Sequence, residues 1–475
     1  MEDLEIITPY GLDKKKALKP YKKEDKSALL TELNLLQKIN EELKDNPKLF
    51  DEIQQIFNKI KNIKYSLQRC ENLKTLDDTE LFEIKNFALA SNELVERLKE
   101  CSFMRFKESI SPLMDVISLL DPENNGLPTF HIYEAYSRDL SEIRRKKLEL
   151  EDRIMKEPES EKREELKEKR FELVSKEREE EFTIRKRLTK TLQQYTDLLW
   201  KNINEIGKLD FLIAKAKLAL KYDAIKPNIT NELKIHLRNF YNPYIKEMLK
   251  KRAKTFIPIT LTVQKGVSVI TGANMAGKTV TLKSFILNTL LAHLGFFVFA
   301  EEAQFPILDY IHFISDDMQS VSRGLSTFGA EIVSLNDLIQ QRRDQECLVV
   351  MDEFARGTNP KEASYLIKAV LNYLNNLNFI TIIATHYDGI IETDMTHYQV
   401  RGLKDVNFEK LKQKININHQ SSIETIQDHM DYQLEQVPSE NEVPKDALNI
   451  AILLGLDQEI INLAKKYYKK GEKNN

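Results

Sequence analysis

Hydrophobic positions divide the 475-residue chain into a helical first part and an alternating second part. In the first part, apolar residues recur every three or four positions, which is the spacing of one helix face. The clearest series is Leu188, Leu192, Tyr195, Leu199, Ile203 and Ile206. Beyond residue 254, short apolar runs at 267–271, 296–300, 347–351 and 379–385 alternate with helix-length stretches. Such runs are typical of buried parallel strands, so the pattern predicts an α + α/β chain with long helices first.

Residues 151–181 interrupt this pattern because most of them are charged. They contain nine Lys or Arg and thirteen Asp or Glu, a net charge of −4. Such a segment has few means to bury itself, so we expect a solvated helical hairpin near 145–185, with Pro158 near its turn. At the other end of the chain, apolar positions on both sides of Gly455 predict a small pair of helices.

Glycine placement suggests where the domains meet. Eleven of the 14 glycines follow position 260, so the second part should be rich in turns and contain a ligand loop. We therefore expect a helical core or lever domain at 1–225, a nucleotide-binding α/β domain at 226–440 and a helical dimerisation element at 441–475.

Composition narrows the range of functions. Lys and Arg number 71 and Asp and Glu number 74, so the net charge of −3 argues against coating nucleic acid through bulk positive charge. A local cluster such as 250–254, with four Lys or Arg, could still bind DNA, although such clusters are more often solvated surface. Three scattered cysteines do not suggest a disulfide framework. The longest apolar stretch, 285–300, is interrupted by polar residues and falls short of the ~20 residues of a membrane span. With an acidic start and no apolar signal, we expect a cytoplasmic protein that does not enter a membrane.

A phosphate-binding pattern follows the first strand of the second part. Residues 272–279 fit G-x-x-x-x-G-K-[ST], with an apolar strand before them and a helical stretch after. Glycines let successive backbone N–H groups surround phosphate oxygens at a helix N-terminus. The sequence therefore predicts ATP and Mg²⁺ here, with Lys278 on the β and γ phosphates and Thr279 on the metal. The nucleotide-binding residues are Gly272, Ala273, Asn274, Met275, Ala276, Gly277, Lys278 and Thr279.

Two later strands end in polar residues suited to hydrolysis. Asp352 and Glu353 follow the run 347–351, and His386 follows the run 379–385. We expect Asp352 near the metal, Glu353 positioned to orient or deprotonate the attacking water, and His386 able to sense the γ-phosphate. A lone acidic pair at a strand end is usually a solvated turn, but the preceding phosphate loop favours catalysis.

These motifs together resemble those of the MutS family of ABC-class ATPases. The resemblance rests on 271–279, on Ser326-Thr-Phe328 with Glu331, on 352–360 and on 384–386, with weaker similarity from about residue 80 to 468. It implies a P-loop ABC-type ATPase domain and a dimer, with the same or a related subunit, that encloses each nucleotide. In that dimer Ser326 and Thr327 would approach the γ-phosphate bound to the other subunit. Phe256 matches a position where the family stacks an aromatic ring on adenine, although packing against the sheet is nearly as plausible.

Two departures from the mismatch-repair members limit what the resemblance implies. Too little chain precedes the core helices for a mismatch-reading module, and both Phe-x-Glu sequences, at 50–52 and 106–108, lie in helical patterns. The hairpin in the place of the DNA clamp is net negative, which disfavours phosphate contacts.

Two kinds of partner therefore remain open. The chain could remodel a protein, because 8–11, 398–403 and 431–434 look similar to a short MutS-like branch associated with cobalamin-dependent aminomutases, whose members are thought to be reactivases. The alternative is ATP-dependent binding of mismatched or branched DNA. The acidic hairpin and the missing reader favour the protein partner.

Overall fold

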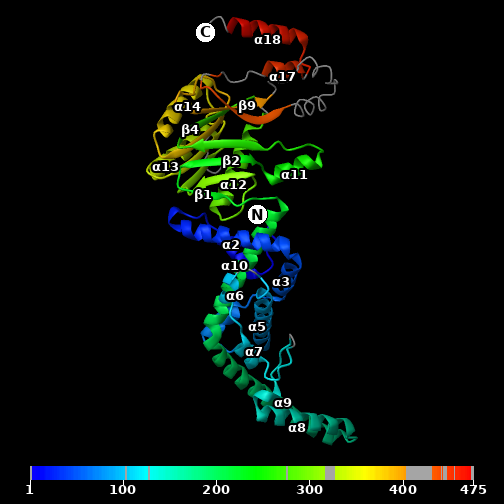
Figure 1. Cartoon of the computed structure of the whole chain (residues 1–475). Helices are drawn as coiled ribbons and strands as arrows, with labels where there is room; N and C mark the ends of the chain where they lie inside the picture. The colour runs from blue at the N-terminus through cyan, green and yellow to red at the C-terminus, as the bar shows by residue number, and fades with distance from the viewer. Residues whose placement is uncertain are drawn as a thin grey trace. The chain divides into compact units, whose positions relative to one another are not determined.

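Three of the four apolar runs form neighbouring strands in a six-stranded sheet (Figure 1). They are β4 (Gly266–Thr271), β7 (Cys347–Asp352) and β8 (Phe379–Thr385). The structure is a computed structural model that describes residues 3–101, 104–126, 129–273, 276–315, 327–402, 430–439, 441, 447–453 and 455–471. The strand order is β10-β9-β4-β8-β7-β6, with β6 (Tyr310–Ile314), β9 (Thr396–Gly402) and β10 (Asp431–Val437). All pairings are parallel except that of β10 with β9.

The run at 296–300 is not a strand of this sheet, so that prediction was wrong. Its residues are buried, but only Val298 forms a bridge, with Ile225. The backbone N–H of Phe299 donates to Oδ1 of Asn288 at 2.7 Å. In a sheet, a carbonyl of the neighbouring strand would accept this hydrogen bond. A run of buried residues can thus satisfy its backbone without joining a sheet.

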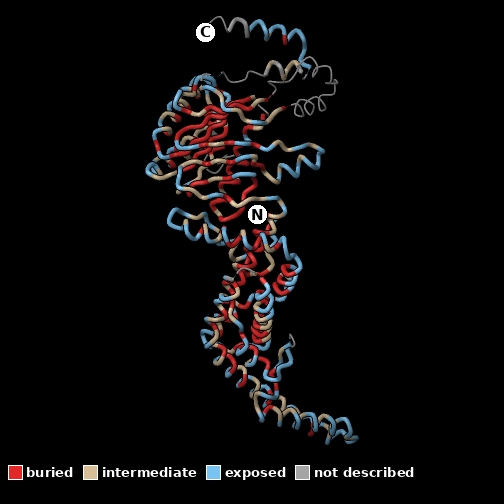
Figure 2. Tube along the Cα trace, viewed as in Figure 1, coloured by how far each residue is buried: buried red, intermediate tan, exposed pale blue. Residues whose placement is uncertain are grey.

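Helices cover both faces of the six-stranded sheet. On one face, α13 (Thr327–Arg342) and α14 (Pro360–Asn375) pack against alternate side chains of β4, β7 and β8. On the other, α12 (Lys278–His293) contacts β7 and β8 and also β2 of a second sheet. Because both faces are covered, every residue of β4, β7 and β8 is buried (Figure 2), as expected for central parallel strands.

The second sheet has four strands in the order β1-β5-β2-β3. Its strands are β1 (Asn228–Thr230), β2 (Lys234–Phe240), β3 (Ile259–Gln264) and β5 (Glu302–Pro306). Helix α11 (Pro243–Lys251) lies between β2 and β3 in the chain. The mixture of helix and sheet agrees with the predicted fold class.

Contacts divide the chain into two units. The first comprises residues 3–18 and 34–218 of the described chain, and the second comprises 19–33 and the described residues from 219. The sequence analysis had assigned 19–33 to the helical domain. These residues pack in the second unit because the backbone N–H of Tyr21 donates to the His293 carbonyl at 2.8 Å.

The described residues of the first unit form helices joined by loops, without a strand. Long helices α2 (Lys26–Asp45, shared with the second unit), α5 (Asp78–Leu98), α9 (Ser160–Leu192) and α10 (Thr196–Lys221) dominate it. Phe50 and Phe106, the two candidate wedge residues, are fully buried, which agrees with their expected place in helices. The shorter helices are α1 (Pro9–Lys16), α3 (Pro47–Lys59), α4 (Lys64–Glu71), α6 (Met104–Ser109) and α7 (Met114–Leu120), with 3₁₀ turns at Lys23–Asp25, Glu134–Tyr136 and Gln193–Tyr195.

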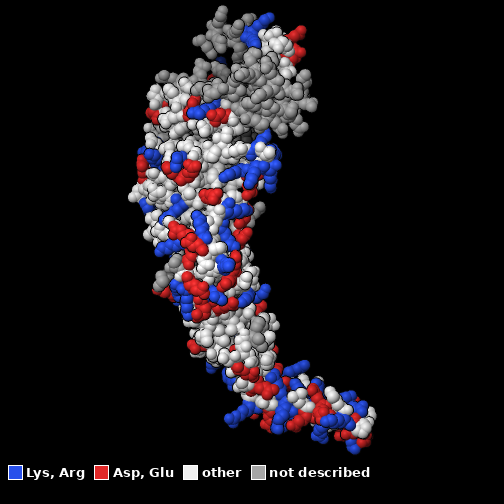
Figure 3. Space-filling model, turned by 45° about the vertical axis from the view of Figure 1, so that its right-hand side comes forward, with Lys and Arg blue, Asp and Glu red and all other residues white. Residues whose placement is uncertain are grey.

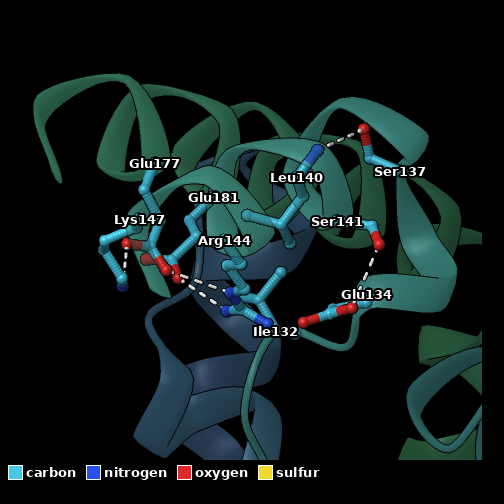
Figure 4. Close-up of polar contacts among 9 residues, drawn as sticks. All are labelled: Ile132, Glu134, Ser137, Leu140, Ser141, Arg144, Lys147, Glu177 and Glu181. Atoms are coloured by element: carbon cyan, nitrogen blue, oxygen red, sulfur yellow. Dashed lines mark hydrogen bonds and ion pairs between the residues drawn. The ribbon is translucent and has the colours of Figure 1, made fainter. Parts of the chain in front are cut away.

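The charged segment folds as a helical hairpin, α8 (Arg138–Lys156) and α9, with Pro158 between them. Figure 4 shows the contacts at its base, where the Arg144 guanidinium reaches three acceptors. It donates to Glu177 at 3.0 Å, to Glu181 at 2.9 Å and to the Ile132 carbonyl at 2.8 Å. We refer to residues 138–192 as the arm. Because Arg144 joins both helices to the preceding loop, it fixes how the arm is attached to the rest of the first unit.

The chain ends in two short helices, α17 (Ala447–Leu453) and α18 (Gln458–Gly471), as the pattern around Gly455 predicted. The cysteines Cys70, Cys101 and Cys347 are buried free thiols. Among the described residues, no helix combines the length and apolar character that crossing a bilayer requires.

Candidate nucleotide site

The predicted site residues gather at one edge of the six-stranded sheet. In the parallel register Thr271 lies opposite Thr385, and Asp352 lies opposite Ala384. The carboxyl ends of β4, β7 and β8 therefore meet at this edge. The phosphate loop, the acidic pair and His386 follow directly from these three strands, as expected for ligand sites in parallel sheets.

Gly277 is the turn at which the loop enters α12. Its φ of +82° lies in the left-handed region, where a side chain would be strained. A Cβ here would also lie 2.9 Å from Cδ1 of Tyr432, whose ring packs against the loop from β10. Of the other loop residues, Gly272, Ala273 and Ala276 are described, whereas Asn274 and Met275 lie outside the described residues.

Lys278 points back into the loop that precedes it. It is buried, and its ammonium donates to the carbonyls of Gly272 at 2.8 Å and Ala273 at 3.1 Å. Burial lowers the pKa of Lys278, and the carboxylates of Glu353 and Asp352 oppose that shift. A positive group is thus held among the carbonyls of the loop that precedes α12.

Asp352 has an unsatisfied oxygen. It is buried, and its Oδ1 has no hydrogen-bond partner among the described residues, although the Thr279 hydroxyl donates to the carboxylate. Burial raises the pKa of Asp352, and the nearby Glu353 carboxylate raises it further. An unpaired buried carboxylate oxygen is costly unless a cation or another donor meets it, so these residues fit a divalent metal.

No group of three His, Cys, Asp or Glu side chains converges in the described part of the chain. A magnesium ion at this edge would therefore take few protein ligands, Thr279 and Asp352, and complete its shell with phosphate and water oxygens. That is the usual way in which proteins hold Mg²⁺ beside a nucleotide.

Glu353 lies in a constrained turn. Its φ is +50°, its N–H donates to the Ala384 carbonyl at 2.9 Å, and its carboxylate pairs with Arg356 at 2.8 Å. Ala355, also at positive φ, donates its N–H to the buried Glu331 carboxylate at 2.9 Å. The turn thus orients Glu353 from two sides. The sequence analysis assigned no role to Arg356 or Tyr432, because their contacts depend on the folded turn and on strand β10.

The remaining predicted residues are less closely connected to the loop. His386 is exposed and stacks on Tyr387, with ring centroids 4.5 Å apart. Phe256 is partly exposed in the segment between α11 and β3. Thr327 is the first residue of α13, and Ser326 lies outside the described residues.

Comparison with known proteins supports the resemblance inferred from the motifs. Residues 268–469 match the sequence model of the family described as MutS domain V. This part of the chain belongs to the MutS family. The MutS-family region includes both the phosphate loop from Gly272 and the acidic pair at 352–353.

The relatives that this chain matches include two proteins named Endonuclease MutS2. The protein from Leuconostoc mesenteroides is 32% identical over 304 residues, which are 63% of this chain and 35% of the relative. That from Acetivibrio thermocellus is 33% identical over 222 residues, 46% of this chain and 27% of the relative. The chain thus matches about a third or less of the length of these relatives. Nothing in the comparisons supports an aminomutase partner.

Proposed function

We propose that this protein hydrolyses ATP and uses the cycle to engage DNA. The proposal of ATP hydrolysis rests on the placement of Lys278, Asp352 and Glu353 at one edge of the six-stranded sheet. All three residues lie in the region that matches the MutS family model. A buried ammonium in the glycine loop after β4 and two carboxylates at the end of β7, with β8 between these strands, are the parts that phosphoryl transfer requires.

Each residue has a distinct task in this proposal. The loop from Gly272 to Thr279 holds the triphosphate, and Lys278 exchanges its two carbonyl contacts for phosphate oxygens. Thr279 and Asp352 hold Mg²⁺, which neutralises charge on the phosphates. Glu353 orients the attacking water, with Arg356 holding its carboxylate in place until substrate binds. His386 reads the presence of the γ-phosphate, and Phe256 stacks on adenine.

We further propose that two copies, or one copy and a related subunit, enclose the nucleotide. The N-terminus of α13 follows Ser326 and begins at Thr327, so its partial positive charge suits the γ-phosphate bound to the partner subunit. Loss of that phosphate would remove the attraction and release the two ATPase regions.

The charge of the complete arm favours DNA over the protein partner. The count of −4 covered only 151–181, whereas residues 138–192, which form the two helices, contain 18 Lys or Arg and 16 Asp or Glu, a net charge of +2. Along α9, Arg178, Phe182, Lys186 and Lys190 recur every four residues and are all exposed. These exposed cations could contact DNA phosphates. Such contacts are compatible with the name of the relatives, Endonuclease MutS2. The argument from an acidic arm therefore does not hold for the folded hairpin.

Two variants test the ATPase. Lys278→Ala should abolish binding of a fluorescent ATP analogue, because no other described loop residue carries a cation. Glu353→Gln should bind ATP, turn over at least about a hundredfold more slowly and accumulate as a closed dimer in size-exclusion chromatography. Normal turnover in the Glu353 variant would reject its assigned role.

DNA is tested separately by ATPase stimulation. Branched duplex DNA at physiological salt should stimulate hydrolysis by the wild type, and stimulation should decrease as salt rises. Lys186→Gln with Lys190→Gln should weaken the stimulation of ATP hydrolysis by DNA. The matched control is Lys465→Gln with Lys466→Gln, which removes two exposed positive charges from α18 instead. Absence of stimulation at any salt concentration would argue against DNA as the partner.

A further inference from the structure

The segment between β2 and β3 carries a basic surface outside the nucleotide site. The two strands pair antiparallel, and Phe240 lies opposite Ile259, so residues 241–258 form an excursion from this hairpin. Within it, Asn242 caps α11 by accepting hydrogen bonds from the N–H groups of Tyr244 and Ile245. The excursion is thus an ordered helix and turn.

This excursion is strongly positive in a chain that is slightly negative. Residues 243–254 contain five Lys or Arg and one Glu, a net charge of +4, against −3 for the whole chain. Lys250, Lys251 and Arg252 are exposed, and within the described residues none of the three forms an ion pair. Lys and Arg side chains gather over α11 in Figure 3. Three adjacent cations without a protein counter-charge favour a polyanionic partner.

An exposed aromatic ring accompanies the cations. Tyr244 is 74% exposed, and Met248, one turn further along, is also exposed. Lys251 follows at the next turn, so these three residues share one side of α11. Tyrosine usually buries most of its ring, and its exposure beside unpaired cations suits a ligand that offers both phosphates and flat surfaces.

We propose that α11 and the turn after it bind a DNA strand with unpaired bases. Lys250, Lys251 and Arg252 contact successive phosphates, and a base stacks on Tyr244. A duplex offers the same phosphates but keeps its bases stacked internally, so only an unpaired strand can use the ring. This inference rests on the proposed engagement of DNA and adds a second contact surface, separate from the arm, that would favour branched over fully paired substrates.

Binding measurements with the full chain test the cations. Lys250→Gln, Lys251→Gln and Arg252→Gln together should weaken binding of single-stranded and duplex oligonucleotides at least about tenfold near 0.1 M salt. The slope of log K against log salt should become shallower by about 2 to 3, because roughly 0.7 to 0.9 counterions are released per phosphate contact. The matched control is Lys38→Gln, Lys44→Gln and Lys48→Gln, three exposed lysines of the first unit.

A second variant tests the ring. Tyr244→Ala should weaken single-strand binding about fivefold or more, leave duplex binding unchanged and leave the salt slope unchanged, because stacking releases no counterions. Tyr365→Ala is the matched control, since Tyr365 on α14 is 73% exposed. Basal ATP hydrolysis should be the same in all four variants, which shows that each is folded.

The outcomes separate this inference from the proposed function. If the wild type binds DNA and the triple α11 variant binds it as tightly as the lysine control does, the surface is not a DNA contact. If Tyr244→Ala affects single strands no more than Tyr365→Ala does, the stacking contact is rejected. If the wild type binds no oligonucleotide, the proposed engagement of DNA itself fails. Binding to anionic lipid vesicles in place of oligonucleotides would also overturn the assignment.

Discussion

The buried ion pair between Lys85 and Asp121 gives the sharpest test of how the first unit is held together. Both side chains are fully inaccessible, and the ammonium lies 3.2 Å from Oδ1 of Asp121. It also donates to the Thr129 carbonyl and the Tyr133 hydroxyl, each at 3.0 Å. The second carboxylate oxygen accepts the N–H of Gly126 at 2.8 Å. The pair thus fixes the loop that precedes the arm to helix α5.

Lys85→Met should destabilise the first unit by about 3–5 kcal/mol, because it leaves the Asp121 carboxylate buried without its counter-charge. Adding Asp121→Asn should recover part of this loss, since asparagine is neutral and still accepts from Gly126. The double variant should therefore cost less than the sum of the two single variants. As a matched control, Lys59→Met breaks an exposed pair with Glu93 and should cost about 1 kcal/mol or less.

Urea unfolding followed by fluorescence measures these changes. Trp200 is the only tryptophan of the chain and lies on α10, with its Nε1 donating to Glu71 at 2.6 Å, so its emission reports the first unit. If Lys85→Met costs no more than Lys59→Met, or if the effects of Lys85→Met and Asp121→Asn are additive, the pair does not stabilise the fold as argued.

The pH dependence of stability provides an independent test of the pair. Burial opposes ionisation of Asp121, but the Gly126 N–H and the Lys85 ammonium outweigh it and hold the pKa below its usual value. A carboxyl with a depressed pKa contributes stability above its unfolded pKa of about 3.9 and loses it as pH falls through the folded value. The double variant should therefore lose less stability than the wild type below about pH 4.

Three further predictions follow from other contacts. Gly207→Ala would place a Cβ 2.8 Å from the Tyr10 carbonyl oxygen. The free energy of unfolding should therefore fall by about 1–3 kcal/mol, although alanine favours helix. An unchanged midpoint of urea unfolding would contradict this contact. Burial lowers the pKa of His293, so the second unit should lose stability as pH falls below 6.5, by at most about 1.4 kcal/mol per pH unit. His293→Gln should flatten that slope in chemical denaturation, and an unchanged slope would exclude His293 as its cause. Arg144→Ala leaves Glu177 with fewer partners, so hydrogen exchange in α8 and α9 should accelerate while α12 stays protected; equal rates would exclude the proposed anchor.

The sequence alone determined the parts of the site that depend on neighbouring residues. The glycine loop, the strand before it and the helix after it are local, and so are the acidic residues that end β7. Parallel strands bring their carboxyl ends to one edge, so a correct reading of 267–271, 347–351 and 379–385 was enough to place the loop beside Asp352 and His386. The density of charged residues in 151–181, with Pro158 near the turn, predicted the hairpin of α8 and α9.

Only the tertiary structure decided how distant segments satisfy one another. The run at 296–300 has the composition of a strand, but the Asn288 side chain takes a backbone N–H that a ladder would have used. Tyr432 reaches Gly277 across 155 residues of sequence, and Arg356 meets Glu353 only because the turn between them adopts positive φ. The sign of the arm's charge likewise depended on where its two helices begin and end. Local patterns record what a segment prefers, whereas the partners that complete each buried polar group come from the whole chain.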